Sequence, residues 1–171
     1  LCEFDNTFNT DMAKTYSGSN GVFSVSSDFA NGAVLDVVSG THYLGQFTVA
    51  GGNIDVSAVD NSLSSAEIGF KFDGTLTTNP IDTMAQQGPM PGERRSMNKV
   101  ILDLSNTLSV SVNNKNYIIR QVTDDLSLAR QAVTGKKEFR LLGYSKDPQV
   151  TISQSAPLSL QVNSLVAEVT F

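Results

Sequence analysis

The sequence predicts a mainly β protein, built as an antiparallel β-sandwich or barrel-like layers with a long irregular loop and at most one or two short helices. Three observations indicate this class. Apolar and polar residues alternate at every second position in many short segments, which is the period of a half-buried strand. Glycine with Asn or Asp separates these segments, as in SGSNG, ANG and AGGN. Hydrophobic residues make up 40% and charged residues only 17% of the chain, a balance typical of β-rich proteins.

The strand-like segments follow one another at short intervals. One of the cleaner examples is IGFKFDG, with Ile68, Phe70 and Phe72 on one predicted face. LSVSVNNKNYIIRQV predicts a hairpin, because Asn residues in the 113–116 loop tolerate positive φ. Strands are expected over residues 22–26, 33–38, 43–49, 53–58, 66–72, 100–104, 108–112, 117–122 and 137–142, and then over a terminal pair, 150–153 and 158–171.

Two segments depart from the strand pattern. Residues 124–132 (DDLSLARQA) predict about two helical turns, with Asp124 as the N-cap. Residues 77–95 hold three of the five prolines and little alternation, and long loops in compact domains are usually functional or disordered. We therefore expect a subunit-contact loop there, with these candidate residues: Gly88, Pro89, Pro91, Gly92, Arg94 and Arg95.

The chain has room for one ordinary domain or two small ones. We expect residues 1–20 to be an arm or the remnant of a preceding domain, because they show no useful periodicity. Residues 21–76 and 96–171 form the two expected β parts, with the 77–95 loop between them; one continuous domain over 21–171 is the alternative. Because the first residue is Leu and no leader pattern follows it, we expect the chain to be part of a longer protein.

The last predicted strand has an unusual end. Its apolar row continues to the terminal residue, Phe171, whereas many domains end in a few polar, frayed residues. Pro157 interrupts the ladder between the two terminal strands. Burial of the apolar row, worth about 1.5 to 3 kcal/mol per large side chain, is expected to hold this end in the domain.

Residues able to carry chemistry are few and scattered. Cys2 is the single cysteine and His42 the single histidine, so neither an internal disulfide nor zinc spacing is available, and we interpret His42 as structural. Asp124 and Asp125 are adjacent and point in different directions, and DNTFNTD (5–11) lacks the glycine and the distal Glu of an EF-hand. The sequence therefore predicts no catalytic residue, no cofactor and no metal site.

The net charge and its distribution along the chain indicate which partners the protein can bind. The formal net charge is −5 and the pI is about 4.7, the opposite of what gripping duplex DNA through its phosphates requires. Residues 1–93 hold only two basic residues, Lys14 and Lys71, whereas Arg94, Arg95 and Lys99 open a more basic C-terminal half. Neighbouring copies that meet charge to charge would use this asymmetry; the alternative is a set of ordinary solvated side chains. No apolar run approaches the ~20 residues that span a bilayer.

Two stretches of the C-terminal half resemble a known family. They are IDTMAQQGPMPGERRSMNKVILDLSNTLSVSV and VTGKKEFRLLGYSKDPQVTISQSAPLSLQVNSLVAEVTF. They are similar to the C-terminal region of the tail nozzle proteins of short-tailed phages, also called tail tubular protein B or packaged-DNA stabilisation proteins. The similarity is firmer over 81–171 than over 40–80, where this chain reads GFKF in place of the family's GLPY. The matching positions are Gly92, Arg94, Arg95, Val100 through Leu108, Thr134, Gly135, Asp147, Val150, Ile152, Gln154, Pro157, Leu158, Leu160, Val162, Leu165, Glu168 and Val169.

The resemblance implies a non-catalytic structural protein of the virion, made in the host cytoplasm. The full-length parent would be a ring of six subunits around the DNA exit channel, with adjacent tail and portal proteins as partners. DNA would pass without specific binding, and neither a membrane nor a small-molecule substrate would be involved. Two other classes stay open: a carbohydrate- or receptor-binding β-sandwich module of a tail appendage, weakened by the absence of Trp, and a glycosidase with paired carboxylates, for which nothing selects a pair.

Overall fold

The computed structural model describes residues 8–80, 84–85, 88–89, 94–117, 129–141, 143–154 and 156–170, and these are the described residues below. They form two compact units. Unit 1 comprises Leu1–Asp73 with the short segments Asp125–Arg130 and Ala156–Leu158, and unit 2 comprises Gly74–Asp124, Gln131–Ser155 and Ser159–Phe171. Every strand pairing is antiparallel and no helix occurs in the described residues, so the predicted mainly β antiparallel class is confirmed. In this part of the chain no helix is both long and apolar enough to cross a membrane.

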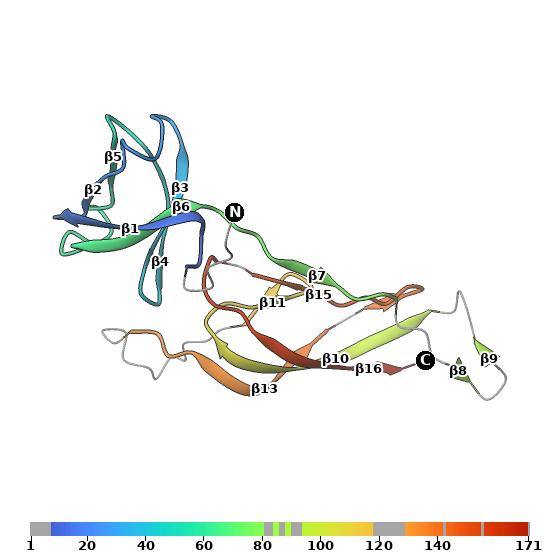
Figure 1. Cartoon of the computed structure of the whole chain (residues 1–171). Helices are drawn as coiled ribbons and strands as arrows, with labels where there is room; N and C mark the ends of the chain where they lie inside the picture. Colours follow the sequence, from blue (N-terminus) through green and yellow to red (C-terminus); the bar gives the residue numbers. More distant parts are fainter. Residues whose placement is uncertain are drawn as a thin grey trace, which may run out of the picture. The chain divides into compact units, whose positions relative to one another are not determined.

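Unit 1 is a single six-stranded sheet that curls into a half-barrel, drawn in blue to green in Figure 1. The strand order is β4-β3-β6-β1-β2-β5. β1 joins the two halves of the sheet, because its first part pairs with β6 and its last two residues pair with β2. The strands are β1 (Asp11–Ser19), β2 (Val22–Ser24), β3 (Val34–Ser39), β4 (His42–Thr48), β5 (Asn53–Asp55) and β6 (Ser65–Phe70).

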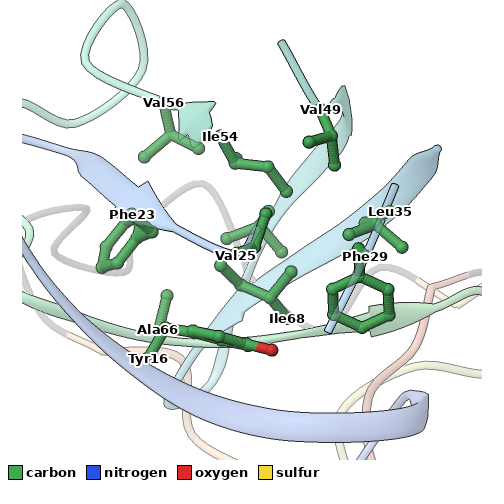
Figure 2. Packing of buried hydrophobic residues seen from close by; sticks show 11 residues of the cluster. Tyr16, Phe23, Val25, Phe29, Leu35, Val49, Ile54, Val56, Ala66 and Ile68 are labelled. Carbon is green, nitrogen blue, oxygen red and sulfur yellow. The ribbon is translucent and has the colours of Figure 1, made fainter. Parts of the chain in front are cut away.

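The concave side of this sheet closes over one hydrophobic core (Figure 2). Aromatic and branched side chains from five strands and the intervening turns fill it, and burial of each large one contributes about 1.5–3 kcal/mol. The core residues are Tyr16, Phe23, Val25, Phe29, Leu35, Val37, Val49, Ile54, Val56, Ala66 and Ile68. Ile68 is therefore buried as predicted. Phe70 is partly exposed but packs edge to face on Phe29 at 5.4 Å between centroids, and Phe72 lies beyond the strand and is exposed.

The interpretation of residues 1–20 as an arm is wrong for residues 11–19, which form β1 inside the sheet. β1 gives little sequence signal, because Tyr16 is its one buried side chain. Gly18 explains part of this: a Cβ there would lie 2.7 Å from the Phe23 ring, so the neighbouring strand fills the space that an apolar residue of β1 would take. The β1–β2 turn, Asn20–Gly21, has φ of 53° and 74°, which are the two positive values of a type I′ hairpin turn.

Unit 2 is a sandwich of two four-stranded sheets. In the first, the long central strand β10 (Arg95–Thr107) pairs with β13 (Val133–Arg140), β14 (Tyr144–Ser145) and β16 (Val162–Thr170). The second has the order β12-β11-β15-β7, and its strands are β7 (Thr75–Thr77), β11 (Ser111–Val112), β12 (Lys115–Asn116) and β15 (Thr151–Ser153). A separate two-stranded ladder joins β8 (Met84–Ala85) to β9 (Gly88–Pro89).

The two sheets of unit 2 share one core of buried side chains. The first sheet supplies Met97, Val100, Leu102, Leu104, Phe139 and Leu141, and the second supplies Val110, Val112, Val150 and Ile152. Leu165 and Ala167 of β16 are partly buried against it. Unit 2 therefore has the sandwich architecture that the alternating pattern predicts.

β-Bulges explain why the predicted and observed strands differ in length. Met97 and Val100 are three positions apart yet both are buried, because one extra residue of β10 lies between the pairs Met97↔Val169 and Lys99↔Glu168. A second bulge, at Asn163 of β16, lies between the pairs that contain Val162 and Ser164. A strict period-two reading loses β10 at the bulge between Met97 and Lys99 and at the register shift between Leu104 and Thr107 in its pairing with β13. It therefore predicts 100–104 where β10 spans Arg95–Thr107.

Of the remaining sequence predictions, some are confirmed, some are wrong and some lie outside the described residues. The 113–116 hairpin is confirmed, with a tighter two-residue turn at Asn113–Asn114 (φ 47° and 63°) between β11 and β12. Residues 129–132 form no helix, and residues 124–128 of the predicted helix lie outside the described residues. So do residues 118–122 of the predicted 117–122 strand, and Phe171. Within the predicted irregular loop 77–95, the β8–β9 ladder is regular structure.

Candidate functional site

The predicted subunit-contact loop is only partly a loop. Gly88 and Pro89 form β9, Arg94 is exposed, and Pro91 and Gly92 lie outside the described residues. Arg95 lies in a strand and not in a loop: it opens β10, pairs with Ser145 of β14 and is only 3% exposed. Because β14 pairs with β10 there, the backbone of Arg95 lies within a ladder.

The two long edges of the first sheet of unit 2 differ in chemistry. β13 carries Lys136, Lys137, Glu138 and Arg140, and Gly135 within it has φ of 104°. Charged side chains on an edge strand protect it from further pairing. β16 has nine residues, Glu168 as its one charged side chain, and no strand on its outer side among the described residues. β16 is therefore the less protected edge.

The outer face of this sheet is polar and self-paired. Lys99 of β10 lies between Glu168, at 3.1 Å, and Glu138, at 4.0 Å, and Arg140 contacts Glu138 at 3.3 Å. These ion pairs are solvent exposed, so each contributes little. One apolar pair interrupts them: Val166 of β16, which is 60% exposed, lies opposite the partly buried Ile101 of β10.

A pocket of about 490 Å³ lies in unit 2, where the start of β10, the β11–β12 turn, β14 and the start of β15 meet. The more apolar part of its lining includes Met97, Leu141 and Pro148, and Tyr144 is its one aromatic residue. The other lining residues are Arg95, Asn113, Asn114, Gly143, Ser145, Asp147, Gln149 and Thr151. Its volume is in the range of small-ligand sites.

Some polar groups of the pocket hold its walls together. The Asn113 carboxamide accepts from Thr151 N at 2.7 Å and donates to the Gln149 carbonyl at 3.3 Å. Ser145 Oγ accepts from Asp147 N at 3.1 Å. The Asn114 side chain and the Asp147 carboxylate have no hydrogen-bond or ion-pair partner in the described part of the chain. These two groups are available to a ligand.

Unit 1 holds two tyrosine–carboxylate pairs. Tyr43 Oη donates to Asp36 Oδ1 at 2.6 Å, and Asp36 is completely buried. Burial and then the Asp36 carboxylate raise the pKa of Tyr43 well above its usual range.

The second pair is more open to water. Tyr16 Oη donates to Asp28 Oδ2 at 2.7 Å, and Lys14 and Ser27 reach the same oxygen. Burial first and Asp28 second raise the pKa of Tyr16, while the hydrogen bonds from Tyr16, Lys14 and Ser27 lower the pKa of Asp28 to about 2. Both pairs fix local structure within unit 1.

The remaining sequence candidates do not converge. His42 is the first residue of β4, half-buried and paired with Ser39 of β3. Cys2, Asp124 and Asp125 lie outside the described residues. Within the residues that the structure describes, no group of three His, Cys, Asp or Glu side chains is arranged to hold a metal ion.

Charge separates along the chain at the unit boundary. Residues 1–73 contain nine acidic and two basic residues, a formal charge of −7, and residues 74–171 contain eight acidic and ten basic residues, a formal charge of +2. The two lysines of the first segment are both paired, Lys14 with Asp28 at 3.0 Å and Lys71 with Asp73 at 2.9 Å. The asymmetry seen in the sequence thus coincides with the two folded bodies.

No protein-family model matches this chain, and no curated protein matches it either.

Sequence reasoning did not find the pocket. Its lining comes from three segments, 95–97, 113–114 and 141–151, which only the fold brings together. The one available signal was local: GYSKDP places a tyrosine directly after a glycine and among polar residues, where alternation gives it no core position.

Proposed function

We propose that the chain is a structural part of a phage tail nozzle, in which copies assemble into a ring around the DNA exit channel within the virion. The sequence resemblance suggests this role, and the free edge of β16 is the observation that carries it. A sheet edge offers a row of unpaired backbone N–H and C=O groups to a neighbouring chain. β16 offers nine residues of edge with a single charge.

The charge distribution supports contacts between unlike surfaces. A ring requires head-to-tail interfaces, in which one surface of a copy meets a different surface of the next. The −7 charge of residues 1–73 and the +2 charge of residues 74–171 give two such surfaces opposite sign. The net charge of −5 also suits a subunit past which DNA must slide without sticking.

Sedimentation velocity tests the assembly. We expect the intact nozzle subunit to sediment as a ring of six. The 171-residue chain should self-associate more weakly than the intact subunit, because contacts made elsewhere in the parent are missing, and its association should increase with concentration. Val166→Lys places a charge on the exposed face of β16 and should weaken association. Val59→Lys is the matched control, since Val59 is 58% exposed in a turn of unit 1.

Two results would overturn this proposal. An intact subunit that stays monomeric at every concentration excludes the ring, and association that Val166→Lys and Val59→Lys affect equally excludes the β16 edge as its interface.

A further inference from the structure

The pocket of unit 2 presents an aromatic ring that packing does not explain. Tyr144 is 72% exposed, the highest value among the large hydrophobic side chains that the structure describes. It lies on the two-residue strand β14, held by pairing with the start of β10. Gly143, with φ of 128°, precedes it. A tyrosine offers a flat apolar face and a polar hydroxyl at its edge, so this position suits a ligand that is apolar on one side.

The polar groups of the pocket set the rest of the ligand chemistry. The Asn114 carboxamide supplies a donor and an acceptor, and the Asp147 carboxylate supplies acceptors. Both are free of partners in the described residues, as shown above. Gln149 donates through Nε2 to the Thr78 carbonyl at 3.2 Å, which leaves its side-chain oxygen as a further acceptor. A ligand with several hydroxyl groups, which both donate and accept, can pair with all three side chains.

Other ligand classes fit less well. A phosphate or nucleic-acid strand would meet the Asp147 carboxylate, which repels the anionic groups through which such ligands bind. An apolar peptide would leave the Asn114 and Asp147 side chains buried without partners, at a cost in free energy. A pyranose ring has C–H groups on one face and hydroxyls around its rim, and so matches both parts of the pocket.

We propose that this pocket binds a short neutral oligosaccharide, with one sugar ring against Tyr144 and its hydroxyls hydrogen-bonded to Asn114 and Asp147. The inference goes beyond the proposed ring assembly and does not depend on it, because all of the lining belongs to unit 2 of one chain.

Saturation-transfer difference NMR of the whole chain tests the site, with maltotriose, cellotriose, chitotriose and lactose as probes at millimolar concentration. At least one probe should receive transfer, and Tyr144→Ala should weaken its binding about tenfold. Phe72→Ala, which removes an exposed ring of unit 1 (54% exposed), should leave binding unchanged. Asp147→Asn should weaken binding, whereas Asp73→Asn should have no effect.

The outcomes separate clearly. Transfer to none of the four probes overturns the proposal, and so does binding that Tyr144→Ala and Asp147→Asn leave intact. The amide spectrum of each variant, unchanged away from its mutated site, confirms that the chain is folded. Binding that is weakened in Tyr144→Ala and Asp147→Asn, and unchanged in the two unit 1 variants, supports the proposed oligosaccharide site.

Discussion

Replacement of Tyr43 by Phe should lower the free energy of unfolding of unit 1, and the hydrogen bond from Tyr43 to Asp36 sets the expected size of this change. The Asp36 carboxyl group is 0% exposed and receives one hydrogen bond, from Tyr43 Oη at 2.6 Å. Its second oxygen has no partner in the described residues. Because the ring stays, Tyr43→Phe removes this bond and little packing. Loss of a hydrogen bond to a charged group costs about 1.5–3 kcal/mol, or a fall in melting temperature of at least about 6 °C for a body of this size.

Differential scanning calorimetry measures the effect, and Tyr16→Phe is its control. The acceptor of Tyr16 is Asp28, whose side chain is 34% exposed and keeps bonds from Lys14 and Ser27, so this change should cost less. In an Asp36→Ala background, Tyr43→Phe should lose most of its effect. If Tyr43→Phe costs no more than Tyr16→Phe, the buried carboxyl does not depend on Tyr43.

Three further predictions follow from the same contacts. Deletion of residues 165–171 removes most of the strand that pairs with β10, so the chain should unfold or aggregate, and an unchanged melting temperature would contradict this. Glu67→Ala removes the acceptor of four hydrogen bonds from Asn9 and Thr10, so limited proteolysis should cut before β1 faster than in Glu168→Ala. Asp28 has its pKa lowered from 3.8 to about 2, so it adds stability above pH 4 that disappears as the pH falls through about 2; Asp28→Asn should flatten that part of a stability–pH curve.

The sequence predicted the fold class and the strands with clean alternation, because a half-buried strand must place every second side chain in the core. It failed where the backbone departs from that period. Met97 and Val100 both face the core across a bulge, which no period-two pattern includes. The alternating pattern did not predict β1, because Tyr16 is its one buried side chain. Phe23 of the neighbouring strand fills the space beside Gly18.

Local sequence patterns also predicted the candidate sites only in part. The edge of β16 follows from a strand that the sequence predicts, although its being an edge is a property of the sheet order. Arg95 was grouped with an exposed loop because GPMPGERR reads as irregular, and β14, which covers it, lies about fifty residues further along the chain. The Tyr144 pocket needs three distant segments at once, and local patterns do not contain that information.

The long-range pairing of unit 2 also sets an order of events on the ribosome. The six-stranded sheet of unit 1 can form once residues 8–73 have emerged, because all of its strands lie within that stretch. β7 must wait much longer: Leu76 pairs with Ile152, 76 positions later. Val100 and Leu102 of β10 likewise lack part of their core until the segment with Val150 and Ile152, and then β16, leave the exit tunnel. A nascent chain would thus carry one finished body while the apolar strands of the other remain in need of protection from neighbouring chains.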